Sequence, residues 1–132
     1  KIRETKESTD TTFSIIAPRK LWIQENCEVF GKGRDYVNKL PGKFTLIFAL
    51  KHEDCVANNV NPNDNQTLGV RIPNHWISEI AKELNKPIII TDISKLPIGI
   101  RNKVDFAINE GIIKGNPSQV VDLVSGEAEI KR

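Results

Sequence analysis

The sequence contains few cysteines, no methionine, few aromatic residues and no excess of charge of one sign. Among 132 residues there are 2 cysteines, and Phe, Trp and Tyr together make up 6%. So few cysteines exclude a small scaffold stapled by disulfides. The 19 Lys and Arg residues nearly balance the 17 Asp and Glu residues, so charge alone does not indicate nucleic-acid binding. No apolar run approaches the roughly 20 residues of a membrane-spanning helix, and we expect no membrane partner.

The cysteines and histidines lack the spacing of a metal site. We therefore expect Cys27 and Cys55 to be free thiols of a reducing, cytoplasmic compartment, with a disulfide between them left open. His52 and His75 have no partner at zinc-ligand spacing, and we expect no metal ligands. The N-terminus matches neither a signal peptide nor a transit segment. Because methionine is absent, we expect the sequence to begin inside a longer protein.

What is present is the length and composition of one ordinary domain. The chain has 39% hydrophobic and 27% charged residues, which is typical of globular domains. Strand-like and helix-like patterns are mixed along it, which predicts an α/β fold with a twisted, mixed sheet and packed helices. We expect three helices, over Lys20–Cys27, Arg34–Leu40 and His75–Leu84. We expect strands over Phe13–Ala17, Phe44–Leu50, Thr67–Ile72, Pro87–Thr91, Val104–Ile108, Gln119–Val124 and, as an edge strand, Glu127–Lys131.

Two of these elements carry the clearest patterns. The run Phe44–Leu50 is continuously apolar and rich in strand formers, which predicts that both of its faces are covered. Asn74 has the character of an N-cap for the third helix. The apolar positions of that helix recur at helical spacing. We expect a core that includes Phe13, Phe44, Phe48 and Trp76.

Arg71 is the first candidate for chemistry, because it lies inside an apolar strand. A charge in such a place is either paired or faces a cleft. Its planar guanidinium suits a carboxylate or a phosphate, which predicts a clamp for an anionic ligand. The alternatives are an Arg that faces solvent and an Arg with a structural carboxylate partner.

Two further candidates follow or precede strands. Thr91, Asp92 and Ser94 come directly after a buried strand, where ligand sites are common in α/β sheets; the alternative is a capping or turn role for Asp92 or Ser94. Ser118 enters a strand from the turn at Gly115-Asn-Pro, where it is either a ligand contact or a turn-stabilising hydroxyl. No spacing in the sequence supports a catalytic triad.

Taken together, several segments resemble the YrdC/YciO-type family, the threonylcarbamoyl-AMP synthases. They occur in the order of the family and cover most of the chain from Phe13 onward. The most specific are the elements G-V-R-I-P-N-H at residues 69–75 and P-S-Q-V-V-D-L at residues 117–123. The others are L-P-G-K-F-T-L-I-F at 40–48, K-P-I-I-I-T at 86–91 and N-K-V-D-F-A-I-N-E-G at 102–111.

The resemblance implies a YrdC-like fold and a cytoplasmic enzyme. It implies condensation of L-threonine, bicarbonate and ATP into threonylcarbamoyl-AMP with release of pyrophosphate, and Mg²⁺ accompanying the ATP. The product would feed the threonylcarbamoyladenosine modification of tRNA, and double-stranded RNA or tRNA-modification proteins are possible partners. The resemblance also implies that residues 1–132 form a single domain that lacks the N-terminal part of the family.

The resemblance also implies roles for particular residues. Arg71 matches the Arg that holds the threonine carboxylate, by a bidentate pair. Catalytic residues and metal ligands are not assigned. The substrate-binding positions are Arg71, Ser118 and Ser94. The nucleotide-binding positions are Lys6, Thr67, Asp92 and Arg132.

The sequence departs from the family in its motifs. Ser8 replaces an Arg of the K-x-R motif, and the T-S-x-N motif reads Thr91-Asp-Ile-Ser94. Two alternatives therefore stay open beside the synthase. One is a degenerate paralogue that binds a nucleotide or double-stranded RNA without synthase activity. The other is a different enzyme that uses Asp92 as a metal ligand or base.

Overall fold

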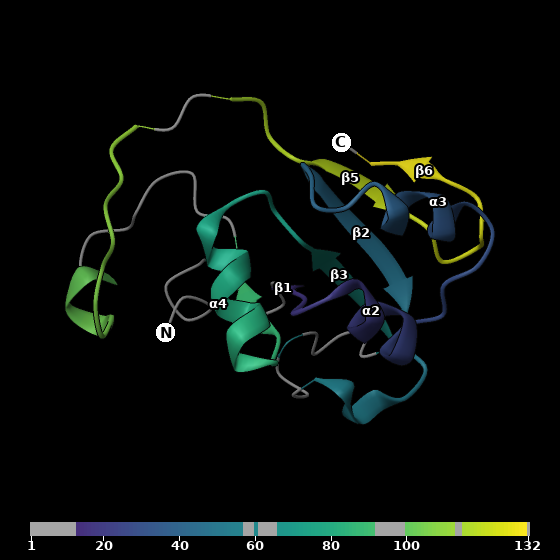
Figure 1. Ribbon diagram of the computed structural model, residues 1–132, viewed down its shortest axis with the longest axis horizontal. Coiled ribbons are helices and arrows are strands. Elements are labelled where there is room, and N and C mark those ends of the chain that lie inside the picture. The colour runs from purple at the N-terminus through teal and green to yellow at the C-terminus, as the bar shows by residue number, and fades with distance from the viewer. Residues whose placement is uncertain (1–12, 57–59, 61–65, 92–99, 113–114, 132) are drawn as a thin grey trace.

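The computed structural model describes residues 13–56, 60, 66–91, 100–112 and 115–131. Their centre is a six-stranded sheet with the strand order β4-β1-β3-β2-β5-β6 (Figure 1). The strands are β1 (Ser14–Ile16), β2 (Phe44–Ala49), β3 (Thr67–Arg71), β4 (Ile88–Ile90), β5 (Gln119–Asp122) and β6 (Glu129–Ile130). The α-helices are α2 (Lys20–Asn26), α3 (Lys32–Asn38) and α4 (Trp76–Leu84), and the 3-10 turns are η1 (Glu53–Cys55) and η2 (Ile100–Lys103).

The sheet is mixed, as the sequence predicts. β1 pairs with β3 and β2 with β5 in parallel, whereas β1–β4, β2–β3 and β5–β6 are antiparallel. Parallel neighbours need long crossovers, and the chain between the parallel strands β1 and β3 contains α2, α3 and β2. β6 lies at the edge of the sheet, which confirms the predicted edge strand.

The core lies between the sheet and the helices. Leu46 of β2 is paired with Val70 of β3 on one side and with Val121 of β5 on the other, and all three are fully buried. α2 and α3 add Ile23 and Val37 to this cluster. Burial of such a side chain stabilises the folded state by about 1.5–3 kcal/mol. This cluster therefore holds the central strands against α2 and α3.

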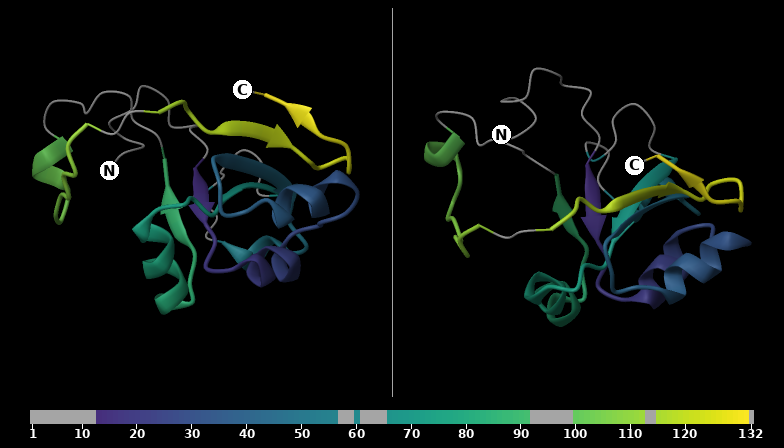
Figure 2. Two further views of the ribbon diagram at one scale, coloured as in Figure 1. Left: turned by 45° about the horizontal axis from the view of Figure 1, so that its top comes forward. Right: turned by 90° about the horizontal axis from the view of Figure 1, so that it is seen from above.

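The described α-helices all pack on one face of the sheet. Figure 2 shows α2, α3 and α4 on the same side of the sheet. Along β2, Leu46 and Phe48 are buried toward that side, whereas Thr45, Ile47 and Ala49 are half-buried. The prediction that both faces of this strand are covered therefore holds for the helical face, and the side chains of the other face are partly covered.

The helix α4 begins one residue later than its sequence suggests. The cap is His75 and not Asn74, because the His75 Nδ1 accepts a hydrogen bond from the backbone N–H of Ile77 at 3.2 Å. The imidazole nitrogen thereby satisfies one of the N–H groups that a helix start leaves free. Trp76 is 40% exposed, so its prediction as a core residue is wrong, while Phe48 is fully buried as predicted.

The predicted strand Val104–Ile108 is absent from the structure. η2 is followed by irregular chain through Ile112, and Figures 1 and 2 show this part set apart from the sheet, beyond α4. Val104, Phe106 and Ile108 alternate as in a strand, yet they are 40%, 77% and 61% exposed. A strand pattern forms a strand only where a neighbour completes its hydrogen bonds, and the described residues offer none here.

Candidate functional site

The candidate site lies on the face of the sheet that the helices leave uncovered. Side chains alternate between the faces of a strand, so Ser14 of β1, Thr45 of β2 and Arg71 of β3 point away from the helices. The register supports this assignment, because their neighbours Ile15, Leu46 and Val70 are paired with one another on the buried face. Polar groups from three adjacent strands therefore share one surface.

Gly69 leaves the middle of this surface without a side chain. It is paired with Ser14 on one side and Ile47 on the other. A Cβ at this position would lie 2.6 Å from the Ser14 Oγ and 3.3 Å from the Thr45 Cγ2. Only glycine fits between these two side chains without a shift.

Arg71 and Ser118 meet across the start of β2. The Arg71 Nη2 donates a hydrogen bond to the Ser118 Oγ at 2.7 Å, although β2 lies between β3 and β5. Ser118 is only 9% exposed and is the buried polar side chain of the described core. Two of the three residues that the sequence assigns to substrate binding are thus in direct contact, and their role as ligand contacts stays a prediction.

This end of the sheet is rich in donors. The guanidinium of Arg71 offers a planar fork that matches a carboxylate, and Lys43, at the start of β2, brings a second positive charge. Its Nζ lies 3.0 Å from the point where a Cβ on Gly115 would be. The arrangement suits a small anion with a further polar group.

Thr67 lies at the opposite end of β3. At about 3.3 Å per residue, it is about 13 Å along the strand from Arg71. Thr91 directly follows β4 at the same end, since Ile90 is paired with Ser14 in the antiparallel β1–β4 ladder. The polar positions that the sequence singles out are therefore divided between the two ends of the strands.

Four of the predicted site residues lie outside the described residues. They are Lys6, Asp92, Ser94 and Arg132. Their neighbours Thr91 and Lys131 are described, and the backbone N–H of Lys131 donates to the Val120 carbonyl oxygen at 2.7 Å. The roles assigned to these four residues remain predictions.

The structure shows one cluster that sequence reasoning missed. The Glu110 carboxylate accepts a hydrogen bond from the His75 Nε2 at 2.9 Å and another from the Trp76 Nε1. These two bonds, with the Trp76 bond the larger cause, hold the pKa of Glu110 below its ordinary value of 4.5. A carboxylate 34 residues away from Trp76 in sequence gives no spacing signal that would reveal the contact.

The two cysteines are both free. Burial raises the pKa of the Cys27 thiol to about 12. Cys55 lies 3.1 Å from the His52 Nδ1, which also contacts the Asp54 Oδ1 at 3.0 Å. Within the residues described, no group of three or more His, Cys, Asp or Glu side chains is arranged to hold a metal ion.

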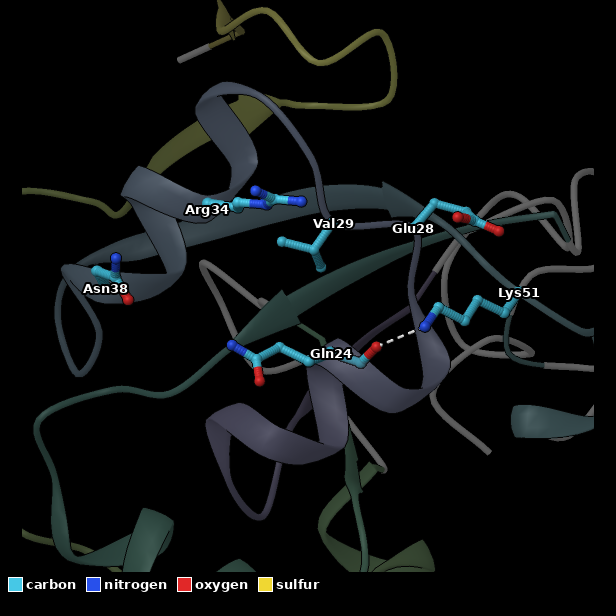
Figure 3. Close-up of a pocket in the computed structure, with 6 residues that line it drawn as sticks. All are labelled: Gln24, Glu28, Val29, Arg34, Asn38 and Lys51. Atoms are coloured by element: carbon cyan, nitrogen blue, oxygen red, sulfur yellow. Dashed lines mark hydrogen bonds between the residues drawn. The ribbon is translucent and has the colours of Figure 1, made fainter.

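Two pockets lie away from the Arg71–Ser118 contact. One, of about 330 Å³, is on the helical side, where Figure 3 shows Arg34 of α3 beside Val29 and the Lys51 Nζ bonded to the Gln24 carbonyl oxygen at 2.8 Å. The other, of about 360 Å³, lies between the start of α4 and the β1–α2 connection. Neither lining includes Arg71 or Ser118.

The family model for Sua5, YciO and YrdC proteins, described as "Telomere recombination", matches residues 1–132. The chain belongs to the Sua5/YciO/YrdC family. Comparison with curated protein sequences gives no match. The α-helices described here are too short and too polar to cross a membrane.

Solved structures of this family share the fold. YciO of E. coli superposes with a TM-score of 0.73 at 18% identity, over 99% of this chain and 70% of YciO. A variant of P. abyssi Sua5 gives 0.77 at 22% identity, over 99% of this chain and 44% of Sua5. MTH1692 of Methanobacterium thermoautotrophicum gives 0.68 at 19%, over 98% of this chain and 66% of MTH1692. The chain thus spans from 44% to 70% of the length of these proteins.

Proposed function

We propose that this member of the Sua5/YciO/YrdC family binds L-threonine at Arg71 and Ser118 and forms threonylcarbamoyl-AMP. The observation that carries the proposal is the 2.7 Å contact between these two side chains on the sheet face opposite the described α-helices. Both belong to the sequence elements that resemble the synthases. The family match over the whole chain supports the same reaction class.

The proposed reaction joins three substrates. The threonine amine adds to the carbon of bicarbonate and water leaves, which gives a carbamate. A carbamate oxygen then attacks the α-phosphorus of ATP, and the bond to the β-phosphate oxygen breaks, so pyrophosphate leaves with its electron pair. Mg²⁺ enters with ATP as part of the substrate and screens the charge of the triphosphate.

The residues on the open face would position these substrates. Arg71 would pair with the threonine carboxylate through its guanidinium fork. Ser118 would accept a hydrogen bond from one nitrogen of that fork and donate its hydroxyl proton to the bound amino acid. Thr67, at the far end of β3, would approach the nucleotide, so the open face would hold the amino acid and the nucleotide side by side.

Calorimetric titration of L-threonine and Mg²⁺–ATP into the protein tests this proposal. We expect both to bind and pyrophosphate to appear once bicarbonate is added. Ser118→Ala should weaken L-threonine binding. Arg34→Ala, a variant at the exposed pocket on the helical side, should leave both steps unchanged. Absence of threonine binding in the wild-type protein would contradict the proposal.

The altered motif residues favour one alternative, a paralogue that binds a nucleotide or double-stranded RNA without catalysis. Ser8 removes a positive charge and Asp92 introduces a negative charge at motif positions. The alternative predicts nucleotide binding without pyrophosphate release. RNA binding, if present, should weaken steeply with salt because it depends on phosphate contacts.

The proposal also covers the cellular compartment and the use of the product. The product would feed the threonylcarbamoyladenosine modification of tRNA in the cytoplasm. The two free cysteines fit a reducing compartment.

A further inference from the structure

The two cysteines are neighbours in the fold. Cys27 directly follows α2 and forms an isolated antiparallel bridge with Leu50. Cys55 is the last residue of η1, and its Sγ lies 3.6 Å from the carbonyl oxygen of Asn26, the residue before Cys27. Peptide bond lengths place that oxygen about 2.8 Å from the Cys27 Cα. The Cys55 thiol therefore lies within about 6.4 Å of the Cys27 Cα, close to the distances that a disulfide spans.

The charge of Cys55 also reaches Cys27. Burial is the largest cause that raises the pKa of the Cys27 thiol to about 12, and the Cys55 thiolate raises it further. Among the charged neighbours, Cys55 comes before Lys51 and Glu28 in the size of its effect. Charges shift a pKa in this way over about 4–6 Å. The electrostatics and the contact with Asn26 thus agree that the two thiols are close together.

The two thiols differ in their access to solvent. Cys27 is 0% exposed and belongs to the core cluster, whereas Cys55 is half-buried. The side chains of His52 and Asp54, which precede Cys55 in the same turn, are 53% and 92% exposed. A small reagent from solvent therefore reaches Cys55 first, and Cys27 reacts only with a group that is already beside it.

His52 gives Cys55 a proton acceptor. The Cys55 Sγ lies 3.1 Å from the His52 Nδ1 and 2.9 Å from the His52 carbonyl oxygen. The attacking species in disulfide exchange is the thiolate, and a neutral imidazole nitrogen at this distance accepts the thiol proton. The Asp54 Oδ1 lies 3.0 Å from the same nitrogen and stabilises the imidazolium that forms.

We propose that Cys55 is a site of reversible oxidation, at which a low-molecular-weight disulfide such as glutathione disulfide is exchanged for a disulfide with Cys27. The Cys55 thiol gives its proton to His52, and its sulfur attacks one sulfur of glutathione disulfide. The S–S bond of the oxidant breaks, and one glutathione leaves with the electron pair and takes the proton from His52. This inference does not depend on the proposed function.

Cys27 completes the reaction. Its sulfur attacks the Cys55 sulfur of the mixed disulfide, the second glutathione leaves with the electron pair, and the thiol proton of Cys27 passes to it. Two protein thiols are thereby oxidised to one disulfide, and glutathione disulfide is reduced to two glutathione thiols. The new bond joins η1 to the end of α2 and closes a loop that contains α3 and β2.

Treatment of the reduced, folded protein with glutathione disulfide tests the inference. We expect both alkylatable thiols to be lost, mass spectrometry to find a peptide pair in which Cys27 is bonded to Cys55, and dithiothreitol to reverse the change. A stable glutathione adduct on Cys55 with Cys27 still free, a disulfide between two copies of the chain, or two unreacted thiols would overturn the inference.

Variants separate the two steps of the reaction. Cys27→Ser should stop at the glutathione adduct on Cys55, whereas Cys55→Ser should leave Cys27 unreacted. His52→Gln should slow the loss of the Cys55 thiol, and His75→Gln, at the other of the 2 histidines, should react like the wild-type protein. Equal rates in the two histidine variants would overturn the role of His52, and oxidation of Cys27 in Cys55→Ser would overturn the predicted order.

Discussion

Arg71 is the residue on which the proposed site depends most. Its guanidinium donates to Ser118, and its planar fork has the geometry that matches a carboxylate. Loss of a charged hydrogen-bonding group costs about 1.5–3 kcal/mol of binding free energy, which is about 10- to 150-fold in Kd.

We therefore expect Arg71→Ala to weaken L-threonine binding by at least about 10-fold. Arg71→Lys should recover only part of the loss, because an ammonium group cannot form the planar bidentate pair. Calorimetry with Arg34→Ala as the control measures this. Equal binding by Arg71→Ala and the wild-type protein would remove Arg71 from the site.

Gly69 provides a second prediction at the scale of one residue. Gly69→Ala should destabilise the protein by about 1–3 kcal/mol, because the new methyl group overpacks the contact with Ser14. The double variant with Ser14→Ala should recover part of this loss, since the 2.6 Å approach is to the Ser14 Oγ. Urea unfolding measures both, and a Gly69→Ala variant as stable as wild type would show that the surface has room here.

The sequence singled out two residues that the structure brings into contact, and for clear reasons. Arg71 and Ser118 stood out because a charge lay in an apolar strand and a hydroxyl preceded one. Their contact joins residues 47 positions apart and depends on strand order, which local patterns do not encode. Glu110 gave no signal at all, because an exposed glutamate near the end of an apolar stretch looks like any surface residue.

The contact between Glu110 and the start of α4 should respond to pH. Hydrogen bonds from Trp76 and His75 lower the pKa of Glu110 below 4.5. A lowered pKa means that the contact stabilises the folded state above the ordinary value and is lost as the pH falls through the lowered one.

We expect the Trp76 indole N–H resonance to titrate with a midpoint below pH 4.5. The same resonance in Glu110→Gln should not show this transition, because the amide does not ionise. A midpoint above 4.5, or the same transition in Glu110→Gln, would argue that another group controls Trp76.

At the scale of elements, the strands were predicted well where they have partners. β1 to β5 each lie within the range that the sequence indicated, because buried strands need continuous apolar runs. Val104–Ile108 has the same alternation without a neighbouring strand. The alternation is compatible with a strand, but no described strand pairs with this segment.

This exposed stretch should be the first site of proteolysis. Phe106 is 77% exposed in chain without regular structure, whereas Phe48 is fully buried. Proteases cut exposed irregular chain first, so brief chymotrypsin treatment should cleave after Phe106. Mass spectrometry of the fragments checks this, with Phe106→Ala as the control. Initial cleavage at Phe48 or Phe44 would contradict the described packing.

At the scale of the whole molecule, the order of strands and helices was enough to predict an α/β fold with a mixed sheet. It did not predict that all three described α-helices lie on one face (Figure 2), because which face a crossover covers depends on handedness and packing. The proposal places the ligands on the opposite face of the sheet. Solved structures of the family contain the same fold within longer chains.

The central claim is that this open face holds L-threonine at Arg71. A crystal structure of the protein with L-threonine and a non-hydrolysable ATP analogue tests it most directly. The account predicts the threonine carboxylate on the Arg71 guanidinium, beside Ser118, with the nucleotide extending toward Thr67. Threonine bound elsewhere, or an Arg71–Ser118 contact that stays closed while the nucleotide alone binds, would contradict it.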